Sequence, residues 1–387
     1  MKKWLFIAVF VCLLIGCKKE FDVFSVIDDA EFKTYCVQFD TNQDGKLSFE
    51  ECSLVTKIDI CGTWDSVGQI TSLKGIEFFP NLKVLKCNHN KLCSLDISHN
   101  LHLDTVYCFH NQLDTLVVGA CNRLKELCCF DNKLRFVDVS NCDSLQELYC
   151  FENRICSLSV SACRLLERLG CDNNNLLYLD VSGCVALKGL YCSSNQLSQI
   201  DITKNKALEE LDCSYNQISI LDVSVFEVLQ DLKCNNNALS HLDVSANRAL
   251  KRLDCVANRL TSLQLGQNDS LKVLYCSENQ LKSMDLSGCT ALQVFYCYKN
   301  FLSALDLSQN TALQIVQCSN NRLITLDISH NKALKDLMCS DMNDENGNNL
   351  LQTLYLYKGQ KIADINVHRS AHNLPAETKI VYLPAPF

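Results

Sequence analysis

Apolar side chains recur at the same positions every 21 residues along most of this chain. In one unit, LKVLKCNHNKLCSLDISHN over residues 82–100, the apolar positions are Leu82, Leu85, Cys87, Leu92, Leu95 and Ile97. Short stretches in which apolar and polar positions alternate are typical of β-strands with one buried face. Each unit therefore predicts two short strands, one that leads into the cysteine and one around Leu95.

A column of cysteines occupies one position in thirteen consecutive units. Its members are Cys87, Cys108, Cys129, Cys150, Cys171, Cys192, Cys213, Cys234, Cys255, Cys276, Cys297, Cys318 and Cys339. A spacing kept without a slip predicts one short coil that stacks on itself many times. A single coil cannot bury its apolar face, whereas stacked coils share one continuous core. We therefore expect an elongated, β-dominated solenoid with a long parallel sheet and short second strands.

An asparagine follows each column cysteine by three residues, from Asn90 to Asn321, except after Cys339, where Met342 takes its place. We expect its amide to bond backbone groups of its own coil and the next, where the chain turns out of a strand. A second turn column mixes Asn and Cys, and Asp-x-Ser steps such as Asp96 and Ser98 precede it. Their short side chains are expected to bond local backbone.

The pattern LxxLxCxxNxLxxLDxSxN resembles the leucine-rich repeat, and most closely its 21-residue class called IRREKO, which is common in surface proteins of Bacteroidetes-type bacteria. The resemblance covers roughly residues 54–366. It implies a leucine-rich-repeat solenoid of about 15 coils over residues 54–357. The first coil, Val55 to Ile60, is irregular, a polar insert at 341–349 breaks the period, and residues 358–387 are expected to form a C-terminal cap.

The 26 cysteines first suggest a disulfide framework. However, in-register residues on neighbouring parallel strands lie about 4.8 Å apart, whereas bridged Cβ atoms lie about 3.8 Å apart. We therefore interpret the column as small apolar side chains inside a narrow coil. A Cys36–Cys52 or Cys52–Cys61 bridge stays open as an alternative, and Cys128 is expected to face solvent.

The N-terminus carries the features of a secretion signal. Lys2 and Lys3 precede an apolar stretch, Trp4 to Ile15, that is short for a membrane span. The sequence Leu-Ile-Gly-Cys ending at Cys17 resembles the bacterial lipobox, which implies cleavage before Cys17 and a lipid on its sulfur. Residues 1–17 would be the signal peptide and 18–27 a tether. We expect a lipid-anchored outer-membrane protein that is exposed at the surface, with a periplasm-facing orientation as the alternative.

Residues 40–51, DTNQDGKLSFEE, resemble an EF-hand calcium loop. The resemblance implies six Ca²⁺ ligands: Asp40, Asn42, Asp44, the carbonyl of Lys46, Ser48 and Glu51. The apolar pattern Phe32, Tyr35, Cys36 and Phe39 predicts an entering helix. A single loop of this kind does not suggest a paired sensor. We expect residues 28–53 to form a small helical cap in which Ca²⁺ closes the open end of the solenoid.

Residues that flank each column cysteine are expected to point outward from the main sheet. Two groups of aromatic residues occupy these positions. The first group is Tyr107, Phe109, Phe130, Tyr149 and Phe151, and the second is Tyr275, Tyr296 and Tyr298. Contiguous exposed aromatic residues predict a binding surface for a protein or a glycan. The alternative is that strands simply favour aromatic residues.

Other functions find less support in the sequence. His89 and His110 occupy equivalent positions one coil apart, where they are either metal ligands or two surface histidines. The net charge of −8 argues against nucleic acid as a partner. We expect a monomeric, non-enzymatic binding protein, with a structural spacer or adhesin stalk as the alternative. An enzyme site within residues 341–387 is a third possibility, in a segment that looks too short to hold one.

Overall fold

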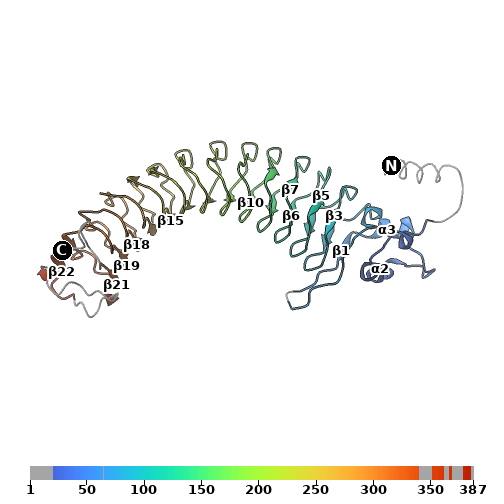
Figure 1. Cartoon of the computed structure of the whole chain (residues 1–387), viewed down its shortest axis with the longest axis horizontal. Helices are drawn as coiled ribbons and strands as arrows, with labels where there is room; N and C mark the ends of the chain where they lie inside the picture. Colours follow the sequence, from blue (N-terminus) through green and yellow to red (C-terminus); the bar gives the residue numbers. More distant parts are fainter. Residues whose placement is uncertain (1–20, 64, 340–350, 361–365, 368–377, 385–387) are drawn as a thin grey trace.

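The computed structural model describes residues 21–63, 65–339, 351–360, 366–367 and 378–384. Successive coils stack side by side into an arc, with the helical N-terminal segment at one end (Figure 1). This arrangement confirms the solenoid that the 21-residue period predicts. Lipidation at Cys17 and the polar insert at 341–349 lie outside the described residues.

One parallel sheet runs through the whole stack and contains fifteen strands. They are β1 (Lys57–Asp59), β2 (Val84–Lys86), β4 (Thr105–Tyr107), β6 (Glu126–Cys128), β8 (Glu147–Tyr149), β10 (Arg168–Gly170), β11 (Gly189–Tyr191), β12 (Glu210–Asp212), β13 (Asp231–Lys233), β15 (Arg252–Asp254), β17 (Val273–Tyr275), β18 (Val294–Tyr296), β19 (Ile315–Gln317), β21 (Asp336–Met338) and β23 (Asn366–Val367). Leu85 pairs with Val106 one period later, and Ile58 pairs with Leu85 across the longer first coil. Equivalent residues therefore stand in straight columns.

The second strand of the repeat forms only in some coils. Those strands are β3 (Ser94–Asp96), β5 (Thr115–Val117), β7 (Phe136–Asp138), β9 (Ser157–Ser159), β14 (His241–Asp243), β16 (Ser262–Gln264), β20 (Thr325–Asp327), β22 (Thr353–Tyr357) and β24 (Lys379–Leu383). They pair in short parallel sheets, of which β20, β22 and β24 form the last. Leu351, Leu354 and Leu356 continue the core into this terminal sheet.

The column cysteines lie inside the stack, as predicted, and each is at most 2% exposed. All cysteines of the described residues are free thiols, so the bridges considered above, Cys36–Cys52 and Cys52–Cys61, do not form. Cys36 and Cys52 are instead two buried thiols of the N-terminal segment. The expectation that Cys128 faces solvent is wrong, because it is only 7% exposed. Its short side chain stands in register between Tyr107 and Tyr149, which are much larger.

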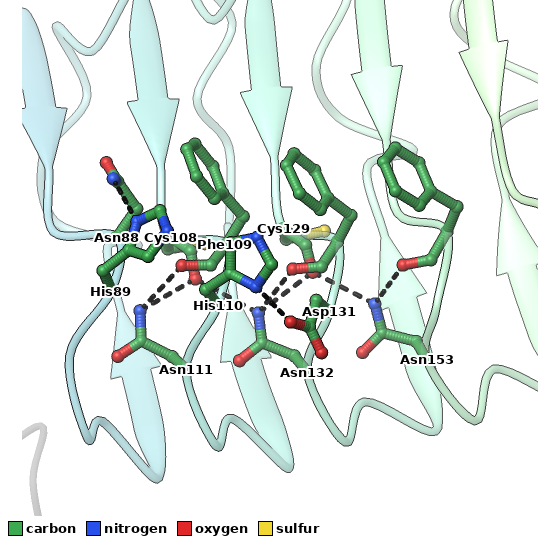
Figure 2. A network of polar contacts seen from close by, with 12 residues as sticks. Asn88, His89, Cys108, Phe109, His110, Asn111, Cys129, Asp131, Asn132 and Asn153 are labelled. Carbon is green, nitrogen blue, oxygen red and sulfur yellow. Dashed lines mark hydrogen bonds and ion pairs between the residues drawn. The ribbon is translucent and has the colours of Figure 1, made fainter. Parts of the chain in front are cut away.

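The asparagine column links neighbouring coils through the backbone. The Nδ2 group of Asn132 donates to the carbonyls of Cys108, Cys129 and Phe130 at 3.1, 3.1 and 3.2 Å. Its Oδ1 accepts from the Leu113 N–H at 2.9 Å. The amide therefore bonds its own coil and the preceding coil, rather than the next one as predicted. Figure 2 shows this ladder from Asn111 to Asn153.

In the second turn column, both Asn and Cys side chains donate hydrogen bonds to backbone carbonyls. Asn100 donates to the carbonyls of Ile76 and Phe79 at 2.8 and 3.1 Å, and Cys121 donates through Sγ to the Val118 carbonyl at 3.1 Å. The Asp-x-Ser step also behaves as predicted. The Asp96 carboxylate accepts from the N–H and the hydroxyl of Ser98 at 3.0 and 2.6 Å.

The N-terminal cap consists of η1 (Val23–Ser25), α2 (Ala30–Cys36), η2 (Val37–Phe39) and α3 (Phe49–Leu54), and it packs against the first coil near η3 (Ile76–Phe78). Residues 18–27 were expected to be a tether, but the described part of that range belongs to the cap. Val23 is fully buried and its N–H donates to the Leu47 carbonyl at 2.9 Å. Phe21 stacks on Phe49 with ring centroids 5.2 Å apart. Apolar residues in this short segment therefore start the cap before residue 28.

Candidate binding face and N-terminal loop

A stack of three phenylalanine rings lies along the N-terminal half of the long sheet. The ring centroids of Phe109 and Phe130 are 4.4 Å apart with planes 7° apart, and those of Phe130 and Phe151 are 4.3 Å apart with planes 10° apart. The rings stack because they occupy one column on consecutive coils, close to the strand spacing of about 4.8 Å. We call Phe109, Phe130 and Phe151 the aromatic ridge.

Tyrosines border the aromatic ridge on the same face. The hydroxyl of Tyr107 donates to the Glu126 carboxylate at 2.9 Å, and the amine of Lys86 lies 5.1 Å from the Tyr107 ring centroid. Burial and a hydrogen bond between Tyr149 and Glu147 raise the pKa of Tyr149 to about 12, with burial the larger cause. The structure therefore brings together all five residues of the first predicted group.

Two histidines pack against the N-terminal end of the ridge (Figure 2). The rings of His89 and His110 are 4.5 Å apart, and the His89 ring meets Phe109 edge to face at 5.4 Å. His110 Nδ1 contacts Asp131 Oδ2, and Asn88 Nδ2 lies 3.0 Å from His89 Nδ1. His89 is only 6% exposed, so describing it as a surface histidine is wrong. Burial, with His110 nearby, lowers the pKa of His89.

These histidines belong to a turn column that the sequence interpretation missed. Every coil from His89 to Asn320 has a non-glycine residue with φ between about 49° and 56° at this position. The column contains His, Asp, Glu, Asn, Ser, Tyr, Ala and Lys, but no β-branched residue. A left-handed backbone disfavours β-branched side chains. Their absence, with the enrichment in Asn, Asp and His, is the signal that would have revealed the turn.

The second predicted group is partly brought together. Tyr275 and Tyr296 have ring centroids 4.8 Å apart with planes 36° apart. The guanidinium carbon of Arg252 lies 5.2 Å from the centroid of the Tyr275 ring. Tyr298 stands on the next outward position of the same coil as Tyr296 and is half-buried. This group is less regular than the aromatic ridge.

Charged side chains occupy the sheet between the two aromatic groups. Lys233 Nζ lies 3.6 Å from Asp212 Oδ2. Burial raises the pKa of Asp172, against the opposing effect of hydrogen bonds from the Ser193 hydroxyl and N–H, both at 2.9 Å. Burial likewise raises the pKa of Asp254. The middle of the face is therefore polar and partly desolvated, and it separates the aromatic groups.

The loop at residues 40–51 is closed by its own hydrogen bonds. The Asp40 carboxylate accepts from the N–H groups of Asp44 and Gly45 at 3.2 and 2.9 Å. Asn42 Oδ1 accepts from the Asp44 N–H at 2.8 Å, and Asp44 Oδ1 accepts from the Lys46 N–H at 2.9 Å. Gly45 has φ 81°, which suits the sharp turn that this loop needs.

Glu51 joins the two ends of the loop. Its Oε1 accepts from the N–H and hydroxyl of Thr41 at 2.8 and 3.0 Å. Its Oε2 accepts from the N–H and hydroxyl of Ser48 at 3.0 and 2.8 Å, which completes a capping box at the start of α3. These bonds, the one from the Ser48 backbone above all, lower the pKa of Glu51 to about 2. Glu51 is therefore ionised and is held by hydrogen bonds from both ends of the loop.

The six candidate ligand atoms of this loop suit calcium, because all of them are oxygen atoms. A shallow pocket brings Asn42, Asp44, Lys46, Ser48 and Glu51 to one place. Among the described residues, however, no three His, Cys, Asp or Glu side chains are grouped so that they could hold a metal ion. Calcium would have to replace some of the hydrogen bonds that Glu51 accepts.

The described residues include no helix that is long and apolar enough to cross a membrane. No family model and no curated protein matches the chain. Its structure, in contrast, is similar to solved structures of leucine-rich-repeat proteins. The fold is a leucine-rich-repeat solenoid.

The functional domain of InlJ from Listeria monocytogenes, described as including a cysteine ladder, is 29% identical with a TM-score of 0.66, over 87% of this chain and 82% of that chain. A leucine-rich-repeat protein of Leptospira interrogans is 26% identical with a TM-score of 0.65, over 71% of this chain and 76% of that chain. An internalin, InlF of Listeria monocytogenes, is 20% identical with a TM-score of 0.62, over 84% of this chain and 93% of that chain. These neighbours are leucine-rich-repeat proteins, and the solenoid's cysteine column has a counterpart in InlJ.

Proposed function

We propose that this chain is a non-enzymatic surface lipoprotein that binds a partner across its long sheet. The aromatic ridge carries the proposal, because a half-buried row of three stacked rings exposes ordered apolar area on a face whose middle is polar. Such patches mark interaction sites more often than they serve the fold. The leucine-rich-repeat neighbours support a binding role for the same architecture.

The test compares the ridge with aromatic residues elsewhere on the solenoid. We would screen the full chain and its triple variant Tyr107→Ser, Phe109→Ser and Phe151→Ser against a glycan array and a displayed peptide library. Phe136→Ser and Tyr178→Ser form the matched control, since these rings are 51% and 64% exposed and lie outside the long sheet. A ligand lost only in the triple variant supports the proposal. If both variants keep every ligand, the chain is a spacer or adhesin stalk instead.

Calcium stabilisation of the N-terminal cap is a further part of the proposal. Asp40, Asn42, Asp44, the Lys46 carbonyl, Ser48 and Glu51 would hold the ion, whose charge would offset three carboxylates in one short loop. The order and chemistry of these donors support the assignment. The existing closure by Glu51 predicts that the cap also folds without calcium.

Two substitutions separate these roles of the loop. Asp44→Asn keeps an oxygen that accepts from the Lys46 N–H but removes a charge, so it should abolish stabilisation by calcium and leave the melting temperature in chelator unchanged. Glu51→Gln should lower the melting temperature in both conditions, because Glu51 joins Thr41 to Ser48. Equal melting of the unmodified chain in calcium and in chelator would rule out the calcium site.

Membrane attachment through Cys17 is the third part. We expect the chain to incorporate labelled fatty acid in a bacterial host and to appear in the outer-membrane fraction. Cys17→Ser should abolish both results, whereas Cys93→Ser, at an exposed thiol, should change neither. Label that persists in Cys17→Ser would refute the anchor. Protease treatment of intact cells would then distinguish surface exposure from a periplasm-facing orientation.

A further inference from the structure

The geometry of the aromatic ridge bears on which class of partner it fits, and this step rests on the proposed function. Sugars stack on the open faces of aromatic rings. Both faces of Phe130 are covered by Phe109 and Phe151, at 4.4 and 4.3 Å between centroids. The ridge therefore presents a row of ring edges to solvent.

Other side chains of this chain also lie against the rings at the N-terminal border of the ridge. His89 packs on Phe109, and Lys86 lies over the ring of Tyr107. At the other end, the Phe151 ring lies beside β10, where a Cβ on Gly170 would stand 3.6 Å from its Cδ1. Few open faces remain for a sugar, whereas ring edges pack well against aliphatic side chains and against the faces of other aromatic rings.

Two carboxylates lie on the same face, separated from the ridge by the row of Tyr107, Cys128 and Tyr149. Glu126 and Glu147 stand directly in register on β6 and β8, on the same outward face as the ridge. Like charges opposite each other on neighbouring strands destabilise a sheet. Each accepts a hydrogen bond from a tyrosine, Tyr107 or Tyr149, and neither forms a salt bridge within the described residues. Arg168, in register with Glu147, donates instead to the Tyr191 hydroxyl at 3.1 Å.

We propose that the ridge and this acidic pair bind a protein segment in which an arginine or lysine stands a few residues from an aromatic or branched aliphatic side chain. The apolar side chain packs on the ring edges, and the cation approaches Glu126 and Glu147. Charge complementarity favours this partner over an acidic one, because no cation in the described part of the chain forms a salt bridge with either carboxylate. The chain's net charge of −8 acts in the same direction.

The experiment selects a random peptide library and screens an oligosaccharide array on the immobilised full chain. Selected peptides are then measured by calorimetry against Phe130→Ser and against the double variant Glu126→Gln and Glu147→Gln. The glutamines keep an oxygen for Tyr107 and Tyr149, so they change charge with little change of shape. Phe136→Ser and Glu152→Gln are the controls, since both side chains are exposed and lie outside the ridge and the acidic pair. Circular dichroism checks that each variant is folded.

We expect the selected peptides to combine a basic with an apolar residue, and their affinity to fall about tenfold or more in both ridge and acid variants. Affinity should also fall with added salt in the unmodified chain but much less in the double glutamine variant. Ridge-dependent peptides that are acidic, or that ignore the glutamine variant, overturn this inference and leave the proposed function standing. Ridge-dependent binding of an oligosaccharide does the same. If no binder of either kind depends on Phe130, the proposed function fails as well.

Discussion

Removing the side chain of Asn132 should weaken the stack between two particular coils. Its Oδ1 accepts from the Leu113 N–H of the preceding coil at 2.9 Å. Its Nδ2 carries two hydrogens for three carbonyls, those of Cys108, Cys129 and Phe130, at 3.1 to 3.2 Å. Asn132→Ala therefore removes about three hydrogen bonds in total, and Asn132 is only 9% exposed.

Each lost bond contributes about 1 kcal/mol, and the backbone groups left behind are buried without partners, so we expect a loss of about 3 kcal/mol. Long repeat arrays do not unfold in a single two-state step. The measurement is therefore hydrogen exchange resolved to the Leu113 amide and its neighbours, together with a urea transition. Protection at Leu113 should fall roughly a hundredfold, while coils near the C-terminal end should change little.

Three companion variants isolate the cause. Asn132→Leu fills similar volume without any donor, so it should be about as damaging as Asn132→Ala. Asn132→Asp keeps an acceptor but points a carboxylate at carbonyl oxygens, so it should be the worst. The control Asn122→Ala lies on an exposed turn and should stay within about 0.5 kcal/mol. If Asn132→Ala behaves like this control, the asparagine ladder does not stabilise the coil interface and our reasoning is wrong.

Three further predictions concern charge, thiols and backbone. Because the pKa of Glu51 is lowered to about 2, its ionisation stabilises the folded chain fully above the unfolded pKa of about 4.3, and this stabilisation is lost as the pH falls towards 2. Glu51→Gln should therefore lower the melting temperature at pH 7, and the melting temperatures of variant and unmodified chain should converge as the pH approaches 2. A bulky maleimide should modify the exposed Cys93 and Cys156 in the native chain and reach the column cysteines only after unfolding; rapid labelling of the column would refute the buried core. Ala257→Gly should stabilise the chain by about 0.5–1 kcal/mol, because Ala257 has φ 54°. Ala238→Gly, at a position without positive φ, should destabilise it. A urea transition that shifts in the same direction for both variants would contradict this prediction.

The architecture could be predicted from the sequence because a repeat removes ambiguity. A single xLxC stretch is too short to assign with certainty, but thirteen copies fix the register, the parallel direction and the inward side at once. Leu85, Cys87 and their equivalents therefore lie where the pattern placed them. The start of the cap was missed because Val23 and Phe24 occur in no repeat, and their partners, such as Leu47, are distant in the sequence.

The candidate site was predictable only in part, for a different physical reason. Column position determines which strand and which face a residue occupies, so the ring contacts between Phe109, Phe130 and Phe151 follow from the spacing. It does not determine how much of a side chain its neighbours cover. Cys128 and His89 occupy outward or turn positions, yet both are buried under larger neighbours.

The same limit explains why protein and glycan could not be separated by sequence, and why the structure favours one of them. An exposed aromatic residue attracts a sugar through its ring face and a protein through either face or edge. A spacing near 4.8 Å lets planar side chains in one column stack, as Phe109, Phe130 and Phe151 do, and stacking covers the faces of these rings. The aromatic ridge therefore presents mainly ring edges to a partner. Tyr275 and Tyr296, with planes 36° apart, do not stack flat, so any sugar binding by this solenoid should occur there rather than at Phe130. Because Arg252 lies over the Tyr275 ring, Tyr296 is the ring to test.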